Sequence, residues 1–140
     1  MTELTLGKMS LDLKKKTLIM GILNVTPDSF SDGGKYFTIE EAVKRAEEMV
    51  KQGADLIDIG GESTRPGAKT VKGHDELNRV IPVVEEIVKR TDVAVSIDTY
   101  KADVAERALD AGAVLVNDVT AMQGDPRMVN LIADQNVHVC

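Results

Sequence analysis

The chain is poor in several residue types, and each shortage excludes a class of protein. One of its 140 residues is a cysteine, Cys140, so a disulfide framework within the chain and a zinc site built on cysteines are both excluded. A reducing cytoplasm is the compartment that this composition predicts. Aromatic residues make up 3% of the chain and tryptophan is absent, which leaves the core to aliphatic residues and alanine. No apolar run has the ~20 residues of a membrane span, so no membrane partner and no signal peptide are expected.

Positive charge is also scarce. Lysine and arginine number 17 against 23 aspartates and glutamates, which gives a formal net charge of −6. A broad surface for nucleic acid or for an anionic membrane is therefore not expected. A small anionic substrate remains compatible with this balance, because a local site can be positive on an acidic protein. Charged residues at 29% and hydrophobic residues at 43% are typical of a globular domain.

Short apolar strands alternate with amphipathic helices along the chain. Strands are predicted over 18–23, 56–59, 93–97 and 113–116, with a fifth beginning at 137. Helices are predicted after the first four strands: one from a capping box at Thr38 and Glu41 to Gly53, one over 77–88, one from Ala102 to Gly112, and one capped by Asp125 and running through Ile132. This alternation predicts a parallel sheet with right-handed crossovers.

Two architectures fit that pattern: a small doubly wound sheet, or the first part of a (β/α)8 TIM barrel. A complete barrel typically needs about 250 residues, and this chain stops inside a strand pattern. We therefore expect an α/β fold of the TIM-barrel type, with four βα units and the start of strand five. Residues 1–140 would form a single partial barrel domain, and residues 1–17 a possible N-terminal hairpin that plugs one end.

Polar clusters follow four of the predicted strands. They are Asn24 to Phe30, Asp58 to Gly67, Asp98-Thr99 and Asn117-Asp118. Ligands bind at the carboxyl ends of the strands in parallel α/β folds. The sequence therefore predicts one active face on which Asn24, Asp98 and Asn117 converge with residues of the second loop.

Asp98 and Asn117 suit a planar ring that carries donors and acceptors. A carboxylate accepts from an amino group and a neighbouring ring N–H, whereas an amide both donates and accepts. The alternative interpretation makes Asp98 the cap of the helix near Lys101 and Asn117 the end of a strand. Asp58, inside a strand pattern, would either line the pocket or brace the loop that contains Arg65, since an unpaired charge there would be costly.

The two long loops carry groups for an anion, a metal ion and a flat substrate. The Thr64 hydroxyl beside the Arg65 guanidinium suits a diphosphate, while Glu62 is expected to pair within the loop. The Asn24 amide oxygen suits a hard cation such as Mg²⁺. Phe30, one of two phenylalanines, could cover a planar substrate. Ordinary turn and capping roles are the alternatives for both loops.

The segments Met20 to Asp32, Asp58 to Gly67, Ser96 to Thr99 and Val116 to Asp118 closely resemble the dihydropteroate synthase family in order and spacing. That family is a transferase of folate biosynthesis, which joins 4-aminobenzoate to a dihydropterin methyl diphosphate and releases diphosphate. The resemblance implies a TIM barrel, a Mg²⁺ cofactor and a homodimer formed through the outer helices. It also implies site roles, which are pterin diphosphate binding by Thr64, Asp98 and Asn117, an aminobenzoate pocket at Phe30, Arg65 and Pro66, and metal contact by Asn24.

The resemblance also sets limits. The family's remaining site residues, a lysine, an arginine–histidine pair and an aspartate, come from its second half and have no positions up to Cys140. The 140 residues alone are therefore expected to show little or no turnover. Two rival interpretations remain: a methyltetrahydrofolate–corrinoid methyltransferase domain with a similar Asp and Asn pair, and a non-catalytic half-barrel. The segments Asn24 to Phe30 and Gly60 to Gly67 favour the synthase.

Overall fold

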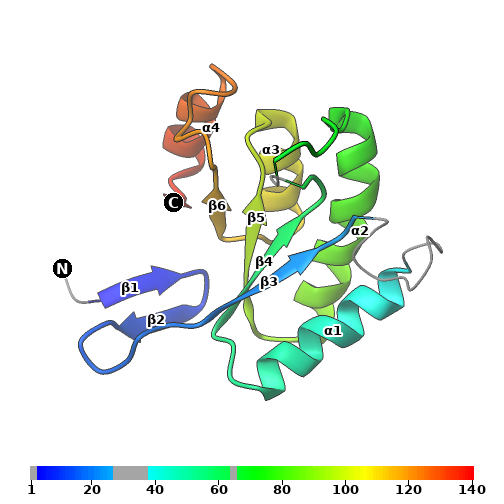
Figure 1. The fold of residues 1–140 in the computed structure, drawn as a ribbon. Helices are drawn as coiled ribbons and strands as arrows, with labels where there is room; N and C mark the ends of the chain where they lie inside the picture. Colours follow the sequence, from blue (N-terminus) through cyan, green and yellow to red (C-terminus); the bar gives the residue numbers. More distant parts are fainter. Residues whose placement is uncertain (1–2, 27–37, 64–65) are drawn as a thin grey trace.

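The computed structural model describes residues 3–26, 38–63 and 66–140, which form a parallel sheet with helices and a separate hairpin (Figure 1). In chain order the elements are β1 (Glu3–Leu6), β2 (Met9–Asp12), β3 (Met20–Asn24), α1 (Ile39–Lys51), β4 (Leu56–Gly60), α2 (Gly73–Arg90), β5 (Ala94–Asp98), α3 (Ala102–Asp110), β6 (Leu115–Asn117), α4 (Met128–Gln135) and β7 (His138–Val139). The predicted alternation of strands and helices is confirmed. Among the described residues, no helix has the length and apolarity needed to cross a bilayer.

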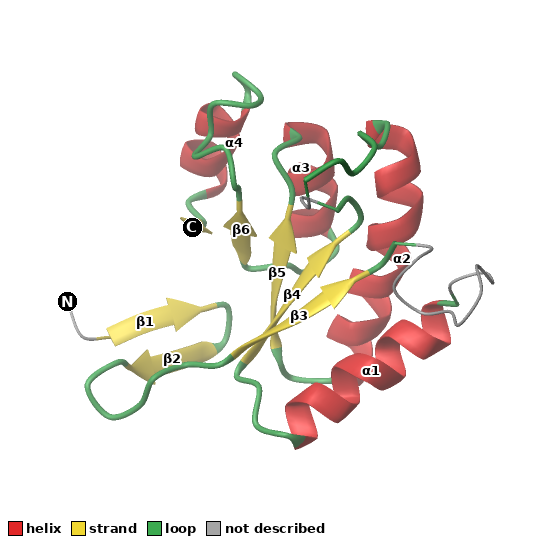
Figure 2. Ribbon diagram, viewed as in Figure 1, coloured by secondary structure: helices red, strands yellow, loops and turns green. Residues whose placement is uncertain are grey.

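The main sheet has the strand order β3-β4-β5-β6-β7, and every neighbouring pair is parallel. Strand order follows chain order without a reversal, and the helices lie on one side of the sheet (Figure 2). A doubly wound sheet would reverse its order and carry helices on both faces. The fold is therefore the TIM-barrel type, with four βα units and a fifth strand, as predicted.

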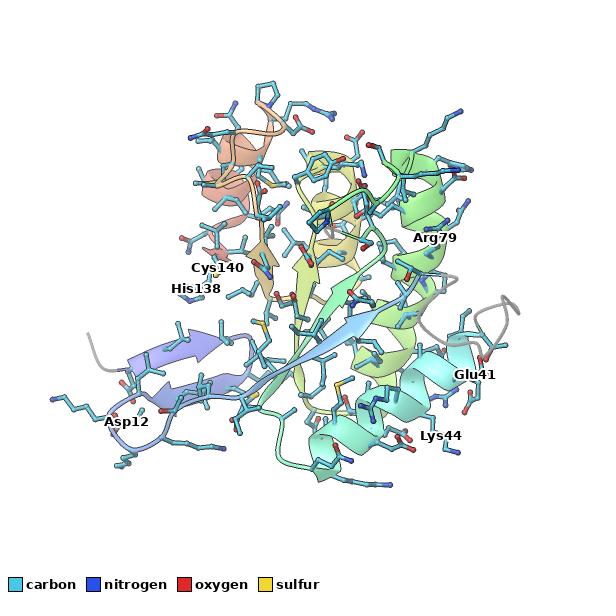
Figure 3. All side chains as sticks on the ribbon, in the orientation of Figure 1. Asp12, Glu41, Lys44, Arg79, His138 and Cys140 are labelled. Carbon is cyan, nitrogen blue, oxygen red and sulfur yellow. The ribbon has the colours of Figure 1, made fainter. Side chains whose placement is uncertain are left out.

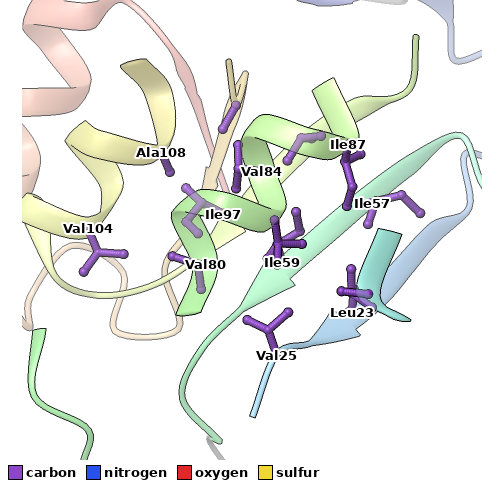
Figure 4. Close-up of a cluster of buried hydrophobic side chains, with 14 of the residues drawn as sticks. Leu23, Val25, Ile57, Ile59, Val80, Val84, Ile87, Ile97, Val104 and Ala108 are labelled. Atoms are coloured by element: carbon purple, nitrogen blue, oxygen red, sulfur yellow. The ribbon is translucent and has the colours of Figure 1, made fainter. Parts of the chain in front are cut away.

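Alternation along each strand explains why the helices share one face. Ile57 and Ile59 of β4 are fully buried and pack toward the helices, whereas Leu56 and Asp58 point to the opposite, inner face. The helix-side core is aliphatic and alanine-rich, as the composition predicts (Figure 4). Its helical members include Val43 and Ala46 of α1, Val80, Val84 and Ile87 of α2, Val104 and Ala108 of α3, and Met128 of α4.

The strands β1 and β2 pair as an antiparallel hairpin within the segment where a hairpin was expected. Leu6 of the hairpin is 2% exposed and packs against Leu56, Ala94 and Leu115 on the inner face. Leu56 and Ala94 are the first residues of their strands. The hairpin therefore covers the amino-terminal end of the sheet, opposite the carboxyl-terminal rim where the predicted site residues lie. A hydrogen bond of 2.8 Å between His138 Nε2 and the Thr5 carbonyl oxygen joins this hairpin to β7 (Figure 3).

Helix boundaries agree with the sequence at α1 and differ at α4. The predicted capping box is present, since Thr38 Oγ1 accepts from the Glu41 amide at 3.1 Å and the Glu41 carboxylate accepts from the Thr38 amide at 3.2 Å. The predicted start of the fourth helix after Asp125 is too early, because α4 begins at Met128. The Asp125 carboxylate accepts from the Arg127 amide at 3.0 Å in the turn before α4, and also from the Ala102 amide at 3.0 Å at the N-terminus of α3.

Candidate functional site

The carboxyl ends of the strands bring three predicted site residues into one row. Asn24, Gly60, Asp98 and Asn117 are successive cross-strand partners on β3, β4, β5 and β6. Side chains alternate between the two faces along a strand, so residues in one row share a face. A shift of one residue in the pairing register of β5 would turn the Asp98 side chain toward the helices. The expected convergence is confirmed for Asn24, Asp98 and Asn117, whereas Thr64, the fourth residue of that prediction, lies outside the described residues.

Gly60 leaves room in this row for the Asp98 carboxylate. A Cβ atom at residue 60 would lie 3.3 Å from Asp98 Oδ2 and 3.4 Å from Asp98 Cβ. Such contacts are tighter than most real Cβ contacts and would press the carboxylate away from β4. The glycine therefore determines how closely Asp98 can lie against its neighbouring strand.

Asp58 supports Asn117 from one row deeper on the inner face. Asp58 is 3% exposed, and its Oδ2 accepts a hydrogen bond of 3.0 Å from Asn117 Nδ2. This bond fixes the side-chain amide and leaves its oxygen and second N–H for a ligand. Of the two alternatives for Asp58, lining the pocket is the one that this geometry favours.

Two buried polar atoms on the inner face have no hydrogen-bond partner within the described part of the chain. They are Asp58 Oδ1 and Ser96 Oγ. Asp58 and Ser96 are cross-strand partners, so the two atoms belong to the same patch of the inner face. Buried polar groups are nearly always paired, and two unpaired ones together indicate that this face meets further polar groups.

The electrostatic environment of Asp98 is acidic. Burial raises the pKa of the Asp98 carboxyl to about 6, and repulsion from Asp58, Glu76 and Asp118 adds to the rise. A ligand that donates N–H groups to this carboxylate would favour its ionised form. Perturbed carboxyl groups of this kind are concentrated at functional sites.

The capping interpretation of Asp98 is wrong. At the N-terminus of α3, the Lys101 amide donates to Thr99 Oγ1 at 3.2 Å and the Ala102 amide donates to Asp125 Oδ2 at 3.0 Å. Neither bond uses Asp98, so its carboxylate stays directed to the rim rather than to the helix.

The described partners of Glu62 lie outside its own loop, in which it was expected to pair, whereas residues 64 and 65 of that loop are outside the described residues. Its carboxylate contacts Lys101 Nζ and accepts from the Tyr100 hydroxyl at 3.2 Å, 38 residues away in sequence. The same ammonium contacts Glu76 Oε2 at 2.6 Å. No local motif signals this cluster, because its members come from a loop, from α2 and from the start of α3.

The other predicted site residues are less informative in the structure. Phe30, Thr64 and Arg65 lie outside the described residues, whereas Asn24 and Pro66 are exposed. Among the described residues, no group of three or more His, Cys, Asp or Glu side chains could hold a metal ion. Val119, which directly follows the polar pair Asn117-Asp118, is 67% exposed and was not among the predicted site residues.

Comparison with known proteins identifies the family behind this rim. A family model described as pterin binding enzyme matches residues 20–140. The chain belongs to the pterin-binding enzyme family. A curated member of similar sequence is the dihydropteroate synthase of Bacillus subtilis (strain 168), with 55% identity over 130 residues, 93% of this chain and 46% of that protein.

Solved structures agree with this membership of the pterin-binding enzyme family. A Xanthomonas albilineans dihydropteroate synthase with 4-aminobenzoic acid has a TM-score of 0.91 and 47% identity, covering 99% of this chain and 50% of that one. A structure of the enzyme from the same organism in complex with 7,8-dihydropteroate has a TM-score of 0.85 and 42% identity, covering 98% and 49%. The chain spans about half the length of the curated relatives that it matches.

Proposed function

We propose that this chain provides the pterin-binding part of a dihydropteroate synthase, which condenses 4-aminobenzoate with 7,8-dihydropterin-6-ylmethyl diphosphate and releases diphosphate. The observation that carries the proposal is the pair Asp98 and Asn117, which are direct cross-strand partners on the inner face with Asp58 bonded to the amide. Two dihydropteroate synthases among its relatives are 55% and 50% identical to it over 130 and 135 aligned residues. Solved relatives described with 4-aminobenzoic acid and with 7,8-dihydropteroate support the choice of substrates.

Asp98 and Asn117 would recognise the aminopyrimidinone edge of the pterin. The carboxylate accepts from the exocyclic amino group and a neighbouring ring N–H, and the Asn117 amide donates and accepts beside it. Analogues without that polar edge would leave buried groups unpaired and would be rejected. Val119, exposed at the same rim, offers an apolar surface to the flat ring.

The diphosphate would lie along the outer part of the rim. Thr64 would donate its hydroxyl to a phosphate oxygen, and Asn24 would contact a Mg²⁺ ion shared with the diphosphate. The exposed amide of Asn24, in the same row as Asp98, fits this role, because Mg²⁺ is commonly held by few protein oxygens together with substrate phosphates and waters. When bound, the ion would neutralise charge on the departing diphosphate.

The second substrate would bind at the loops beyond β3 and β4. Phe30 would cover the ring of 4-aminobenzoate, and the Arg65 guanidinium would pair with its carboxylate, beside the exposed ring of Pro66. With its ring and carboxylate bound in this way, 4-aminobenzoate would present its amine to the methylene carbon of the pterin substrate. The resemblance further implies a cytoplasmic homodimer that associates through the outer helices.

The reaction requires positioning more than acid–base chemistry. The C–O bond to diphosphate breaks and its electron pair leaves with the diphosphate, while the arylamine nitrogen forms the new C–N bond and then releases a proton to water. The electron-rich pterin stabilises positive charge at the methylene carbon. The residues described above hold the two substrates in line and exclude competing water.

Asp98→Ala in the full-length enzyme tests the proposal. Two charge-assisted hydrogen bonds are lost, so the pterin dissociation constant should rise roughly 100-fold while the fold is kept. Asp103→Ala, which removes an exposed carboxylate on α3 that pairs with Arg127, is the matched control and should bind normally. Calorimetric titration with a pterin ligand measures both. Unchanged affinity in Asp98→Ala refutes the assignment, and pterin binding without synthase turnover in the wild type would favour the methyltransferase alternative.

A further inference from the structure

A partly buried ion cluster is centred on Lys101, three residues beyond Asp98 of the proposed site. Its ammonium contacts the carboxylates of Glu62 and Glu76, the latter at 2.6 Å. The side chains of Lys101, Glu62 and Glu76 are 18%, 14% and 1% exposed. The Tyr100 hydroxyl donates to Glu62 at 3.2 Å, and its ring centroid lies 4.6 Å from Lys101 Nζ.

Removing charged groups from water costs free energy, so stability alone does not explain why these elements are joined by an ion cluster. Burial of the ammonium lowers the pKa of Lys101, but hydrogen bonds and attraction from the two carboxylates outweigh burial and leave this pKa raised. Two carboxylates share one lysine, so the group keeps an excess negative charge. Buried ion pairs seldom stabilise more than well-packed apolar residues do, which points to a role in fixing one conformation.

The cluster holds a specific piece of backbone. Gly61 has no room for a side chain, because a Cβ atom would lie 2.8 Å from Val80 Cγ1 and 3.0 Å from Glu76 Cγ. Arg79 of α2, labelled in Figure 3, donates to the Gly61 carbonyl oxygen at 3.1 Å. With Glu62 bound to Lys101, the chain is therefore fixed at two successive residues just after β4.

Both sides of the cluster are connected to the proposed substrate sites through the chain. Glu62 directly precedes the stretch 63–66 that leads to Pro66, and Lys101 follows Asp98 by three residues. The salt bridge between Glu62 and Lys101 thus ties the residue two positions beyond β4 to the residue three positions beyond the end of β5. Displacement of about 1 Å in a positioning element can lower the rate of a reaction by up to two orders of magnitude.

We propose that Lys101 is a positioning residue for 4-aminobenzoate, which acts through Glu62 and Glu76 to hold Gly61 and Glu62, the start of the loop that leads to Pro66. This inference rests on the proposed synthase function. It assigns the cluster to the second substrate rather than to the pterin, because Glu62 lies on the same loop as Pro66. Lys101 itself need not touch either substrate.

Lys101→Met and Lys101→Arg in the full-length enzyme provide the main test. In Lys101→Met the KM for 4-aminobenzoate should rise about tenfold, while the pterin dissociation constant stays within about twofold. Lys101→Arg keeps the positive charge and should restore most of the loss. Glu62→Gln, which keeps the shape of the side chain, should raise the same KM even if Lys101→Met does not fold.

Arg90→Met is the matched control. It breaks an ion pair between α1 and α2, with Arg90 Nη2 at 2.9 Å from Glu40 Oε2, that does not contact the loop after β4. Its KM for 4-aminobenzoate should be unchanged. A purely structural cluster would lower the melting temperature of Lys101→Met and leave both substrate constants unchanged, or change both equally, and either result would overturn the inference.

Hydrogen exchange over the segment 61–67 separates this inference from the proposed function. Lys101→Met should speed exchange there several-fold, and Arg90→Met should not. Absence of turnover in the wild type would contradict the synthase proposal. The hydrogen-exchange rates would still show whether Lys101 restrains this part of the chain. Unchanged exchange rates in both Lys101→Met and Glu62→Gln would show that the Lys101–Glu62 contact does not restrain the backbone, and would overturn the inference.

Discussion

The side-chain amide of Asn117 donates a hydrogen bond of 3.0 Å to the buried carboxylate of Asp58, 59 residues earlier in the chain. The two residues belong to β6 and β4, which are separated by β5. The residue of β5 opposite Asp58 is Ser96, whose side chain is small enough for the bond to form beside it. The orientation of the Asn117 side chain therefore depends on the relative positions of β4, β5 and β6.

Removal of the Asp58 carboxylate should weaken pterin binding. Asp58→Ala takes away the acceptor that orients Asn117, so the pterin dissociation constant should rise by about tenfold, the value of one hydrogen bond to a charged group. Asp58→Asn retains an oxygen acceptor and should lose much less. Calorimetric titration of the full-length variants is the measurement. Equal losses in Asp58→Ala and Asp58→Asn would show that the charge, not the bond, is what matters.

Pterin affinity should depend on pH through Asp98. Its pKa is raised to about 6, so the carboxyl takes up a proton as pH falls below 6 and no longer accepts from both N–H groups of the ligand. Affinity should therefore decline from pH 7 to pH 5. The contribution of Asp98 to the free energy of unfolding changes with pH in the opposite direction. A raised carboxyl pKa favours the folded state at low pH, and this contribution is lost as pH rises through 6. Titrations at several pH values test this, and Asp58→Asn should move the midpoint downward.

Arg65→Ala should separate the two substrates. Loss of the guanidinium should chiefly raise the KM for 4-aminobenzoate and lower turnover, because the residue would pair with the carboxylate of that substrate. Simple pterin affinity should change little. Steady-state kinetics in the full-length enzyme, together with pterin titration, make the comparison. A loss of pterin affinity as large as the rise in KM would contradict this division of labour.

Two glycine variants should differ in stability for a reason visible in the structure. Gly61→Ala would place a Cβ atom 2.8 Å from Val80 Cγ1 and should lower the free energy of unfolding by about 1–3 kcal/mol, the usual penalty of overpacking. Gly73 is the first residue of α2, and Gly73→Ala would place a Cβ atom 3.7 Å from Lys101 Cδ, an ordinary van der Waals contact. It should be neutral or stabilising by up to about 1 kcal/mol. Urea unfolding of both variants provides the test.

The isolated 140-residue chain should self-associate. β3 and β7 are the outer strands of the main sheet, and Ile22 of β3 is 62% exposed on the inner face. An edge strand has unpaired backbone N–H and C=O groups that can pair with a strand of another chain, and exposed apolar side chains favour such association. Ile22→Lys should reduce association, whereas Val129→Lys, at a position 52% exposed on α4, should not. Light scattering over a concentration series decides, and a stable monomer at high micromolar concentration with cooperative unfolding would contradict the expectation.

The sequence by itself determined the order of strands and helices and the position of the candidate site residues at the strand ends. Apolar runs ending in polar residues predicted each strand and placed Asp98 and Asn117 at strand ends, and the Thr38–Glu41 box predicted the start of α1. These signals are local, because they depend on side-chain alternation, helical spacing and hydrogen bonds across three or four residues. The alternation of elements then limited the fold to parallel α/β architectures.

Only the tertiary structure decided which polar side chains meet. Glu62 contacts Lys101 across 39 residues, Asp125 binds the Ala102 amide across 23, and Asn117 reaches Asp58 across 59. Asp125 and Asn117 keep the local roles that the sequence indicated as well, because Asp125 also accepts from the Arg127 amide before α4 and Asn117 ends β6. Contacts of this length arise when whole strands and helices pack, and burial then favours whichever partner satisfies the charge.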